Sequence, residues 1–279
     1  ERALAIWEKV LGPDHLDTAT SLHNLASLHE AQGQYVKALP LYERALAIRK
    51  TVLGPEHPDT VTSLGSLAGV HTSQGQYTQA QPLYERVLAI REKTLGPEHP
   101  DTATSLNNLA VLYKMQGQYA HAMPLYERAL AIAEKVLGPD HLDTATRLNN
   151  LAALHHTQGQ YGQAQPLYAR AIAIQEKVLG PDHLDTATSL NNLGLLYRAQ
   201  GQYAKAQPFS VRALRIFERA LGPDHPKTAT SLNNLVALYE AQGQYHQAQP
   251  LCERVLAITE KVLGPDHPHT AMSLNNLAL

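Results

Sequence analysis

The sequence predicts an all-α fold built as a solenoid of antiparallel helix pairs, because two motifs recur at one fixed period. The motif Leu-Gly-Pro-Asp/Glu-His occurs seven times, always 42 residues apart, beginning at Leu11, Leu53, Leu95, Leu137, Leu179, Leu221 and Leu263. The motif Gly-Gln-Tyr has the same period and begins at Gly33, Gly75, Gly117, Gly159, Gly201 and Gly243. Self-similarity at a period of about 20 to 50 residues is typical of tandem repeat arrays.

Length and composition fit an array in which each unit buries its apolar face on its neighbours, so that no central core is needed. The 279 residues include 23 basic and 25 acidic residues, for a formal net charge of −2. Because this balance produces no strong field, and because no run of about 18 apolar residues occurs, we expect neither a nucleic-acid nor a membrane partner. The sequence shows no charged-then-apolar leader, and its single cysteine, Cys252, cannot form an internal disulfide. These features fit a cytoplasmic location.

The first half of each unit is predicted to be a helix with one apolar face. In the third unit, Leu106, Leu109, Ala110 and Tyr113 follow the spacing i, i+3, i+4, i+7, which places them on one side of a helix. Gly117 supplies the left-handed residue that commonly ends a helix, and the next helix begins only two residues later. So short a connection implies that the two helices are antiparallel.

The second half is predicted to be the more buried helix, with alanines such as Ala122 where two backbones approach closely. We place Pro124 in its first turn, where a missing N–H costs little. The helix ends at Gly138-Pro139, and Asp140 is expected to cap the next helix, with Asp143 completing a capping box. In the two units that carry Glu56 and Glu98 instead, Pro58 and Pro100 are expected to be first-turn prolines.

These boundaries define one solenoid over residues 1–279. It comprises a partial helix at 1–11, full units at about 12–53, 54–95, 96–137, 138–179, 180–221 and 222–263, and a partial helix at 264–279. Solenoids normally end in polar capping helices. Since neither end of this sequence has one, we expect a fragment of a longer protein.

At this point the residues match a known family. Leu109-Ala110, Tyr113, Ala122, Tyr126 and Ala129 resemble, at the same spacings, the signature of tetratricopeptide repeats. The longer period is similar to the repeats of kinesin light chains and to the repeat arrays attached to signalling ATPases of bacteria and fungi. The resemblance implies a right-handed superhelix that binds protein or peptide partners. It does not identify the partner, because that family binds many unrelated proteins.

Asparagine pairs recur in the first helices, which line the concave face in this family. They are Asn107-Asn108, Asn149-Asn150, Asn191-Asn192, Asn233-Asn234 and Asn275-Asn276. By resemblance to kinesin light chain repeats, such amides hold the main chain of an extended peptide. The alternative is that they satisfy backbone groups between adjacent helices. The pattern fails at His23-Asn24 and Gly65-Ser66, so weaker peptide binding is expected in the first two units.

Three first-helix positions vary between units against an otherwise nearly constant frame. One series reads Ser27, Gly69, Val111, Ala153, Leu195 and Ala237; the next reads Glu30, Thr72, Lys114, His156, Arg198 and Glu240; the last reads Ala31, Ser73, Met115, Thr157, Ala199 and Ala241. Such variation indicates either tuning for a ligand or neutral drift at solvated sites. Lys114, His156 and Arg198 are expected to form a positive strip, which favours an acidic peptide. The side chains of Lys114 and Arg198 are expected to be exposed.

The sequence predicts no catalytic residues, no metal site and no cofactor. Seven of the 15 histidines occur once per unit in the recurrent loop, too sparse for a shared zinc site. His29, His71 and His155 replace the apolar-face tyrosine and are expected to be packed core residues, and Cys252 a buried small residue. No P-loop, His-Glu-x-x-His or Gly-x-Ser-x-Gly motif occurs.

The sequence therefore favours a protein or peptide interaction scaffold that binds an extended, acidic segment in its groove. Two other classes remain open. One is a structural spacer that associates head to tail through its nearly identical ends. The other is the ligand-sensing arm of a larger signalling ATPase, whose nucleotide-binding domain would lie outside this sequence.

Overall fold

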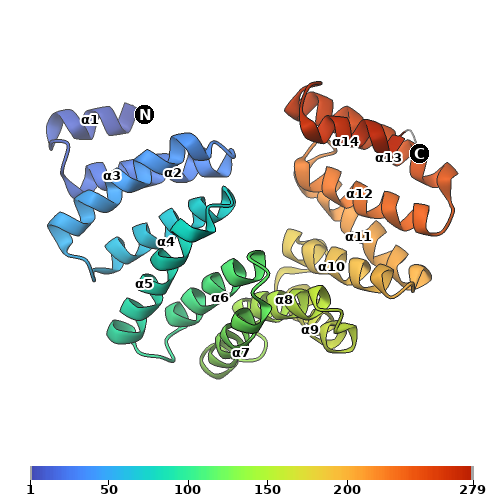
Figure 1. Cartoon of the computed structure of the whole chain (residues 1–279), viewed down its shortest axis with the longest axis horizontal. Coiled ribbons are helices and arrows are strands. Elements are labelled where there is room, and N and C mark those ends of the chain that lie inside the picture. The colour runs from blue at the N-terminus through green and yellow to red at the C-terminus, as the bar shows by residue number, and fades with distance from the viewer. Residues whose placement is uncertain (1, 278–279) are drawn as a thin grey trace. The chain divides into compact units, whose positions relative to one another are not determined.

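A computed structural model describes residues 2–277. Within those residues every regular element is an α-helix, and the helices alternate in direction along the chain (Figure 1). Their bounds are α1 Arg2–Val10, α2 Leu16–Ala31, α3 Tyr35–Leu53, α4 Pro58–Ser73, α5 Tyr77–Leu95, α6 Pro100–Met115, α7 Tyr119–Val136, α8 Leu142–Thr157, α9 Tyr161–Leu179, α10 Leu184–Ala199, α11 Tyr203–Leu221, α12 Pro226–Ala241, α13 Tyr245–Leu263 and α14 Pro268–Leu277.

The chain divides into two compact units, one ending at Leu137 and the other beginning at Gly138. Within each unit the helices stack in chain order, and each first helix packs on the second helix of its own pair and on the pair before it. This arrangement confirms the predicted all-α solenoid of helix pairs. No helix within residues 2–277 is both long enough and apolar enough to span a membrane.

The larger core clusters are shared between neighbouring helix pairs. In the first unit, Ala68, Ala80 and Tyr84 of one pair pack with Leu109 and Leu112 of the next. In the second unit, a larger cluster joins α8 to α11 through Tyr168, Leu190, Leu193, Ile216 and Phe217. Close approach of two helix backbones requires small side chains at the contact. The alanines predicted at these contacts are fully buried, with Ala110 and Ala122 both at 0% exposure.

The two turns of each unit have the geometry that their glycines predict. Gly117, between α6 and α7, has φ of 74°, and Gly138, after α7, has φ of 99°. Both values lie in the left-handed region, which a residue with a Cβ rarely adopts. The short Gly-Gln link and the antiparallel pairing are therefore confirmed.

The first helices are capped by histidine, which corrects the expectation that Asp140 is a cap. The ring nitrogen Nδ1 of His141 accepts the backbone N–H of Asp143 at 3.1 Å, so the helix begins one residue later than the aspartate would place it. The same bond joins His99 to the N–H of Asp101 at 3.1 Å. Asp140 instead forms an ion pair with Lys177 at 2.6 Å. Pro58 and Pro100 do occupy the first helical positions, as expected.

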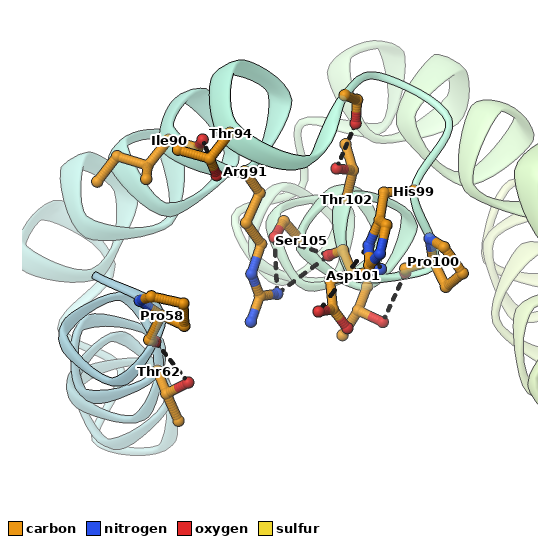
Figure 2. A network of polar contacts seen from close by, with 12 residues as sticks. Pro58, Thr62, Ile90, Arg91, Thr94, His99, Pro100, Asp101, Thr102 and Ser105 are labelled. Carbon is orange, nitrogen blue, oxygen red and sulfur yellow. Dashed lines mark hydrogen bonds and ion pairs between the residues drawn. The ribbon is translucent and has the colours of Figure 1, made fainter. Parts of the chain in front are cut away.

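A threonine closes each recurrent loop. Thr102, fully buried, donates its hydroxyl to the carbonyl of Gly96 at 2.8 Å (Figure 2). The same bond is formed by Thr18, Thr60, Thr144, Thr186, Thr228 and Thr270 to the glycine six residues earlier. Because this carbonyl lies at the end of one helix, the threonine of the next helix satisfies a group that has no partner within the helix.

Charged side chains connect a second helix with the preceding second helix and with the loop that follows it. Arg128 forms an ion pair with Glu92 at 2.7 Å and donates to the carbonyl of Pro97 at 3.3 Å. Lys135 pairs with Glu98, 37 residues earlier, at 2.6 Å. In the second unit, Arg212 and Arg219 pair in the same way with Glu176 and Asp182. Since these pairs are exposed, each contributes at most about 1 kcal/mol, and their main effect is on the register between pairs.

The proline in each second helix lies deeper than expected. Helix α7 begins at Tyr119, so Pro124 is its sixth residue and lies in the second turn. The carbonyl four residues earlier therefore loses its usual helical donor. The prediction of a first-turn position was wrong: the helix begins at Tyr119, as the short link predicts, and five of its residues precede the proline.

One unit departs from the common packing through a paired change. Ser210 is buried where the other units carry a tyrosine or Cys252, and Gly194 of α10 lies against it. A Cβ on Gly194 would lie 2.5 Å from the Ser210 hydroxyl oxygen. The neighbouring ring of Phe209 stacks on Tyr197, with 5.6 Å between ring centroids. The two helices of this pair are thus adapted to one another.

The close contact at Ala122 predicts a strong dependence on side-chain size. Ala122→Leu should lower the free energy of unfolding by about 1–3 kcal/mol, because the added atoms force two backbones apart. Ala120, two residues away in α7, is exposed, so Ala120→Leu should change stability by less than about 0.5 kcal/mol. Urea denaturation followed by circular dichroism measures both, and equal losses would contradict the assigned helix faces.

The histidine caps predict a second effect on stability. His99→Ala removes the acceptor for the Asp101 N–H and should lower stability by about 1 kcal/mol, whereas His99→Asn should retain most of it. His246 is exposed on α13 and serves as the control, for which substitution by alanine should be nearly neutral. Thermal unfolding of the three variants tests this order, and a neutral His99→Ala would show that the cap does not stabilise the helix.

Candidate functional site

The asparagine pairs connect neighbouring first helices in the second unit. The Nδ2 of Asn192 donates to Oδ1 of Asn149 at 3.2 Å, and Nδ2 of Asn234 donates to Oδ1 of Asn191 at 3.1 Å. The second amide of each pair thus reaches back to the first amide of the preceding pair. These bonds join side chain to side chain, so they differ from the backbone contacts of the alternative interpretation.

The amides lie at the surface. Asn149, Asn150, Asn191, Asn192 and Asn234 are half-buried, and Asn233 is exposed. An amide offers two donor hydrogens and an acceptor oxygen, so a single bond between neighbours uses only part of this capacity. The row can therefore present oriented donors and acceptors to a ligand. Asn107 and Asn108, which belong to the first compact unit, are half-buried as well.

The three basic residues occupy the last turns of first helices. Lys114 belongs to the first compact unit, while His156 and Arg198 take equivalent positions in α8 and α10 of the second. All three are half-buried, which corrects the expectation that Lys114 and Arg198 are exposed. The His156 ring packs edge-on against Tyr161, at 5.8 Å between centroids. Burial also lowers the pKa of the Lys114 ammonium.

Half-burial of these residues follows from their place beside the turn that starts the second helix. A long basic side chain there lays its aliphatic part on the neighbouring surface and leaves its polar end at the edge. The sequence pattern identifies the helix position but not how much the adjoining turn covers it. The charged groups at these positions are therefore partly removed from water, which strengthens their interaction with an opposite charge.

A pocket in the first unit was not predicted from the sequence. It has a volume of about 340 Å³ and lies between α4 and α6. Its walls include Glu30, Thr62, Gly65, Ser66, Gly69, Tyr84, Arg91, Ser105 and Asn108. The signal for it was present in the sequence, since Gly65-Ser66 and Gly69 stand where the next unit has Asn107-Asn108 and Val111. The loss of two side chains, and a shorter one at Ser66, opens this space.

Arg91 forms one end of this pocket, and its position is fixed by α6. Its Nη1 donates to the hydroxyl of Ser105 and to the backbone carbonyl of Asp101, both at 3.0 Å. Figure 2 shows the Arg91 side chain extending from α5 to these two residues. The Ser105 hydroxyl in turn donates to the same carbonyl at 3.1 Å. The guanidinium is therefore held in place and can present its other N–H groups to a ligand.

The histidines on the apolar face lie at its edge. The rings of His29, His71 and His155 are half-buried and each forms a hydrogen bond between Nδ1 and the side-chain oxygen of a glutamine five residues later, at 2.9, 2.7 and 2.6 Å. The expectation that they are core residues was wrong, because each ring reaches the turn between the two helices of its pair. Cys252 is buried, as expected, and burial raises the pKa of its thiol.

The structure offers no built metal centre within residues 2–277, where no three His, Cys, Asp or Glu side chains gather. The recurrent loop histidines act as helix caps there. A ring nitrogen that accepts a backbone N–H is not available to bind a metal ion. The loop histidines thus have a structural role that the sequence alone did not identify.

Comparisons with known proteins agree with this architecture. Tetratricopeptide repeat models match residues 1–51, 25–91, 59–135, 122–177 and 148–218, and another matches 228–269. A solved structure from Podosopora anserina, named for kinesin light chain and its nearly identical TPR-like repeats, has a TM-score of 0.61 and 33% identity over 74% of this chain and 98% of that chain. No curated protein matches the chain.

Two further structures share the fold. BtubC (BKLC) from P. vanneervenii has a TM-score of 0.68 and 26% identity over 84% of this chain and 94% of its own. A Rap protein complexed with Competence and Sporulation Factor has a TM-score of 0.62 and covers 92% of this chain and 73% of its own, but at 16% identity it shows the fold alone. Because the repeat models match most of the chain in successive pieces, it belongs to the tetratricopeptide repeat family, and its repeats are similar to those of kinesin light chains.

Proposed function

We propose that this tetratricopeptide repeat chain is a protein interaction scaffold whose first-helix faces bind an extended, acidic peptide. It acts in the cytoplasm, by binding rather than by catalysis. The observation that supports it most directly is the asparagine row, in which amides of neighbouring first helices are fixed by one another and retain capacity for a ligand.

The asparagines orient the peptide main chain. Neighbouring helices lie about 10 Å apart, and an extended peptide rises about 3.3 Å per residue, so each helix pair meets about three ligand residues. The residues assigned to the main chain are Asn107, Asn108, Asn149, Asn150, Asn191, Asn192, Asn233 and Asn234. Because main-chain groups are common to all peptides, these contacts supply affinity without sequence preference.

Lys114, His156 and Arg198 supply the preference for acidic side chains. All three lie in the last turn of a first helix. Lys114 and Arg198 are basic side chains that carry a positive charge, and His156 is a third basic side chain. Their partial burial strengthens the interaction with a carboxylate relative to a fully solvated pair. The glutamates at the same repeat position, Glu30 and Glu240, limit this preference to the units between them.

The preference predicts that charge removal at these positions weakens acidic binding. The probe is a fluorescein-labelled peptide with a leucine flanked by aspartates and glutamates, compared with its Asn/Gln counterpart. Lys114→Gln with Arg198→Gln should weaken binding of the acidic peptide at least tenfold and reduce its salt dependence, because two charge pairs are lost. Fluorescence anisotropy measures both quantities.

Glutamine is used because both sites are half-buried and a new carboxylate there would destabilise the helix turn. The matched control is Lys93→Gln with Lys177→Gln, which removes the same charge from exposed ion pairs on second helices. The control should bind the acidic peptide normally. Equal weakening by both double variants would indicate an effect of net charge alone and contradict the assigned surface.

The asparagine row predicts a loss that does not depend on ligand charge. Asn150→Ser with Asn192→Ser copies Ser66 of the second repeat (residues 54–95) and replaces two amide side chains with shorter hydroxyl side chains. Affinity for the acidic and the amide peptide should fall by the same factor, at least fivefold, since main-chain contacts are lost from both. Loss of acidic binding alone would assign these asparagines to side-chain recognition.

A further inference from the structure

The pocket between α4 and α6 contains a carboxylate for which the fold provides no cation. One oxygen of Glu30, Oε2, accepts the hydroxyl of Tyr42 at 2.7 Å. The carboxylate forms no ion pair with any residue that the structure describes. Glu30 is half-buried at the end of α2 and lines the pocket. A partly desolvated carboxylate is stabilised by an opposite charge, and the open side of this one faces the pocket.

The second oxygen of Glu30 borders the space that Gly69 leaves open. A Cβ built on Gly69 would lie 3.8 Å from Oε1 of Glu30 and 3.7 Å from the hydroxyl of Tyr84. Both groups therefore line the same notch in α4. The next unit has Val111 at this position, whose side chain would occupy the notch.

The two tyrosines keep their protons near neutral pH and so remain neutral. Burial, and then the hydrogen bond to Glu30, raises the pKa of Tyr42 to about 12. Burial also raises the pKa of Tyr84, with Glu30 adding to the effect. The pocket end thus has one negative charge, set among phenol groups. Phenol rings and a carboxylate together suit an ammonium or guanidinium group.

The opposite end of the pocket carries a positive charge. Arg91 is held at Asp101 and Ser105, in the first turns of α6, whereas Glu30 lies beside Gly69, late in α4. Thr62, in the early part of α4, also lines the pocket. Thr62 and Gly69 are seven residues apart on α4, a rise of about 10 Å along the helix. An extended peptide covers this length with about three residues. The pocket is therefore dipolar, and it fits two opposite charges on one short segment.

We propose that this pocket binds a peptide segment that places a basic side chain on Glu30 and a carboxylate, two residues away on the same face, on Arg91. The site belongs to the first compact unit and uses none of the residues assigned above to acidic recognition. It shares only Asn108 with the residues assigned to the peptide main chain. It assigns a function to the position where the asparagine pair is absent.

The test uses the full chain labelled with 15N at its glycines. Gly65 and Gly69 lie in the pocket wall, and Gly194, in the second unit, is an internal reference. The probes are the peptides acetyl-Gly-Arg-Ala-Asp-Gly-amide and acetyl-Gly-Asp-Ala-Arg-Gly-amide, of which the tighter is used, and its counterpart with citrulline for arginine. Citrulline has the shape of arginine without its charge. The amide signals of Gly65 and Gly69 should shift saturably with the arginine peptide while that of Gly194 does not move.

Loss of either charge should weaken binding at least tenfold. The citrulline peptide should show this weakening on the original chain, and the arginine peptide should show it on Glu30→Gln. Glu240→Gln is the matched control, because it removes a carboxylate from the same repeat position far along the sequence, and it should bind normally. Arginine and citrulline peptides of equal affinity, or a Glu30→Gln variant that binds normally, would overturn the proposal.

Two further variants separate binding from folding. Gly69→Val copies Val111 and fills the notch; it should abolish binding while raising helix stability, since glycine is a poor helix former. Arg91→Gln copies Gln175 of the fourth unit and should weaken the aspartate peptide but not its asparagine counterpart. Normal binding by Gly69→Val would place the ligand elsewhere.

The acidic peptide of the previous section is measured in parallel, so that failure of either site is seen independently of the other.

Discussion

Every feature of this chain depends on the burial of one helix pair against the next. A single pair has an apolar face that it cannot cover, and the alanines on that face allow the neighbouring backbone to approach closely enough to cover it. Ala68, Ala80, Ala110 and Ala122 are buried completely. Because each pair completes its neighbour, the surfaces of the first helices are left in regular succession, and ligand-binding groups can be placed on them one pair at a time.

Polar contacts then fix how the pairs align. The buried threonine bond to a glycine carbonyl joins the end of one pair to the start of the next, and exposed ion pairs link a second helix to the preceding second helix or to the loop that follows it. The ion pairs contribute little stability individually. Their regularity matters because the asparagine bonds between first helices require neighbouring amides to meet at about 3 Å.

The period of the sequence was sufficient to predict the helices, their order and the buried alanines, because these follow from local pattern and backbone chemistry. The caps were assigned one residue too early, since aspartate is the stronger cap by propensity and only the structure shows the His141 ring accepting the N–H. The half-burial of Lys114 and the position of His155 depend on how the following turn folds over them. The pocket at Glu30 is opened by Gly65, Ser66 and Gly69 of α4, which the sequence shows, but its walls also come from α2, α5 and α6, and only the structure brings these together.

The paired change at Gly194 and Ser210 has a consequence for how such an array can vary over time. Exchange between repeated segments adds or removes whole 42-residue periods, and any contact with a constant sequence separation is re-formed across the new junction. A junction that falls between Gly194 and Ser210, however, would join an alanine-bearing first helix to a second helix shaped for glycine, with a Cβ directed at the serine oxygen. In that part of the chain, only exchange of the complete hairpin keeps this contact, even though the period itself is restored by a break at any residue.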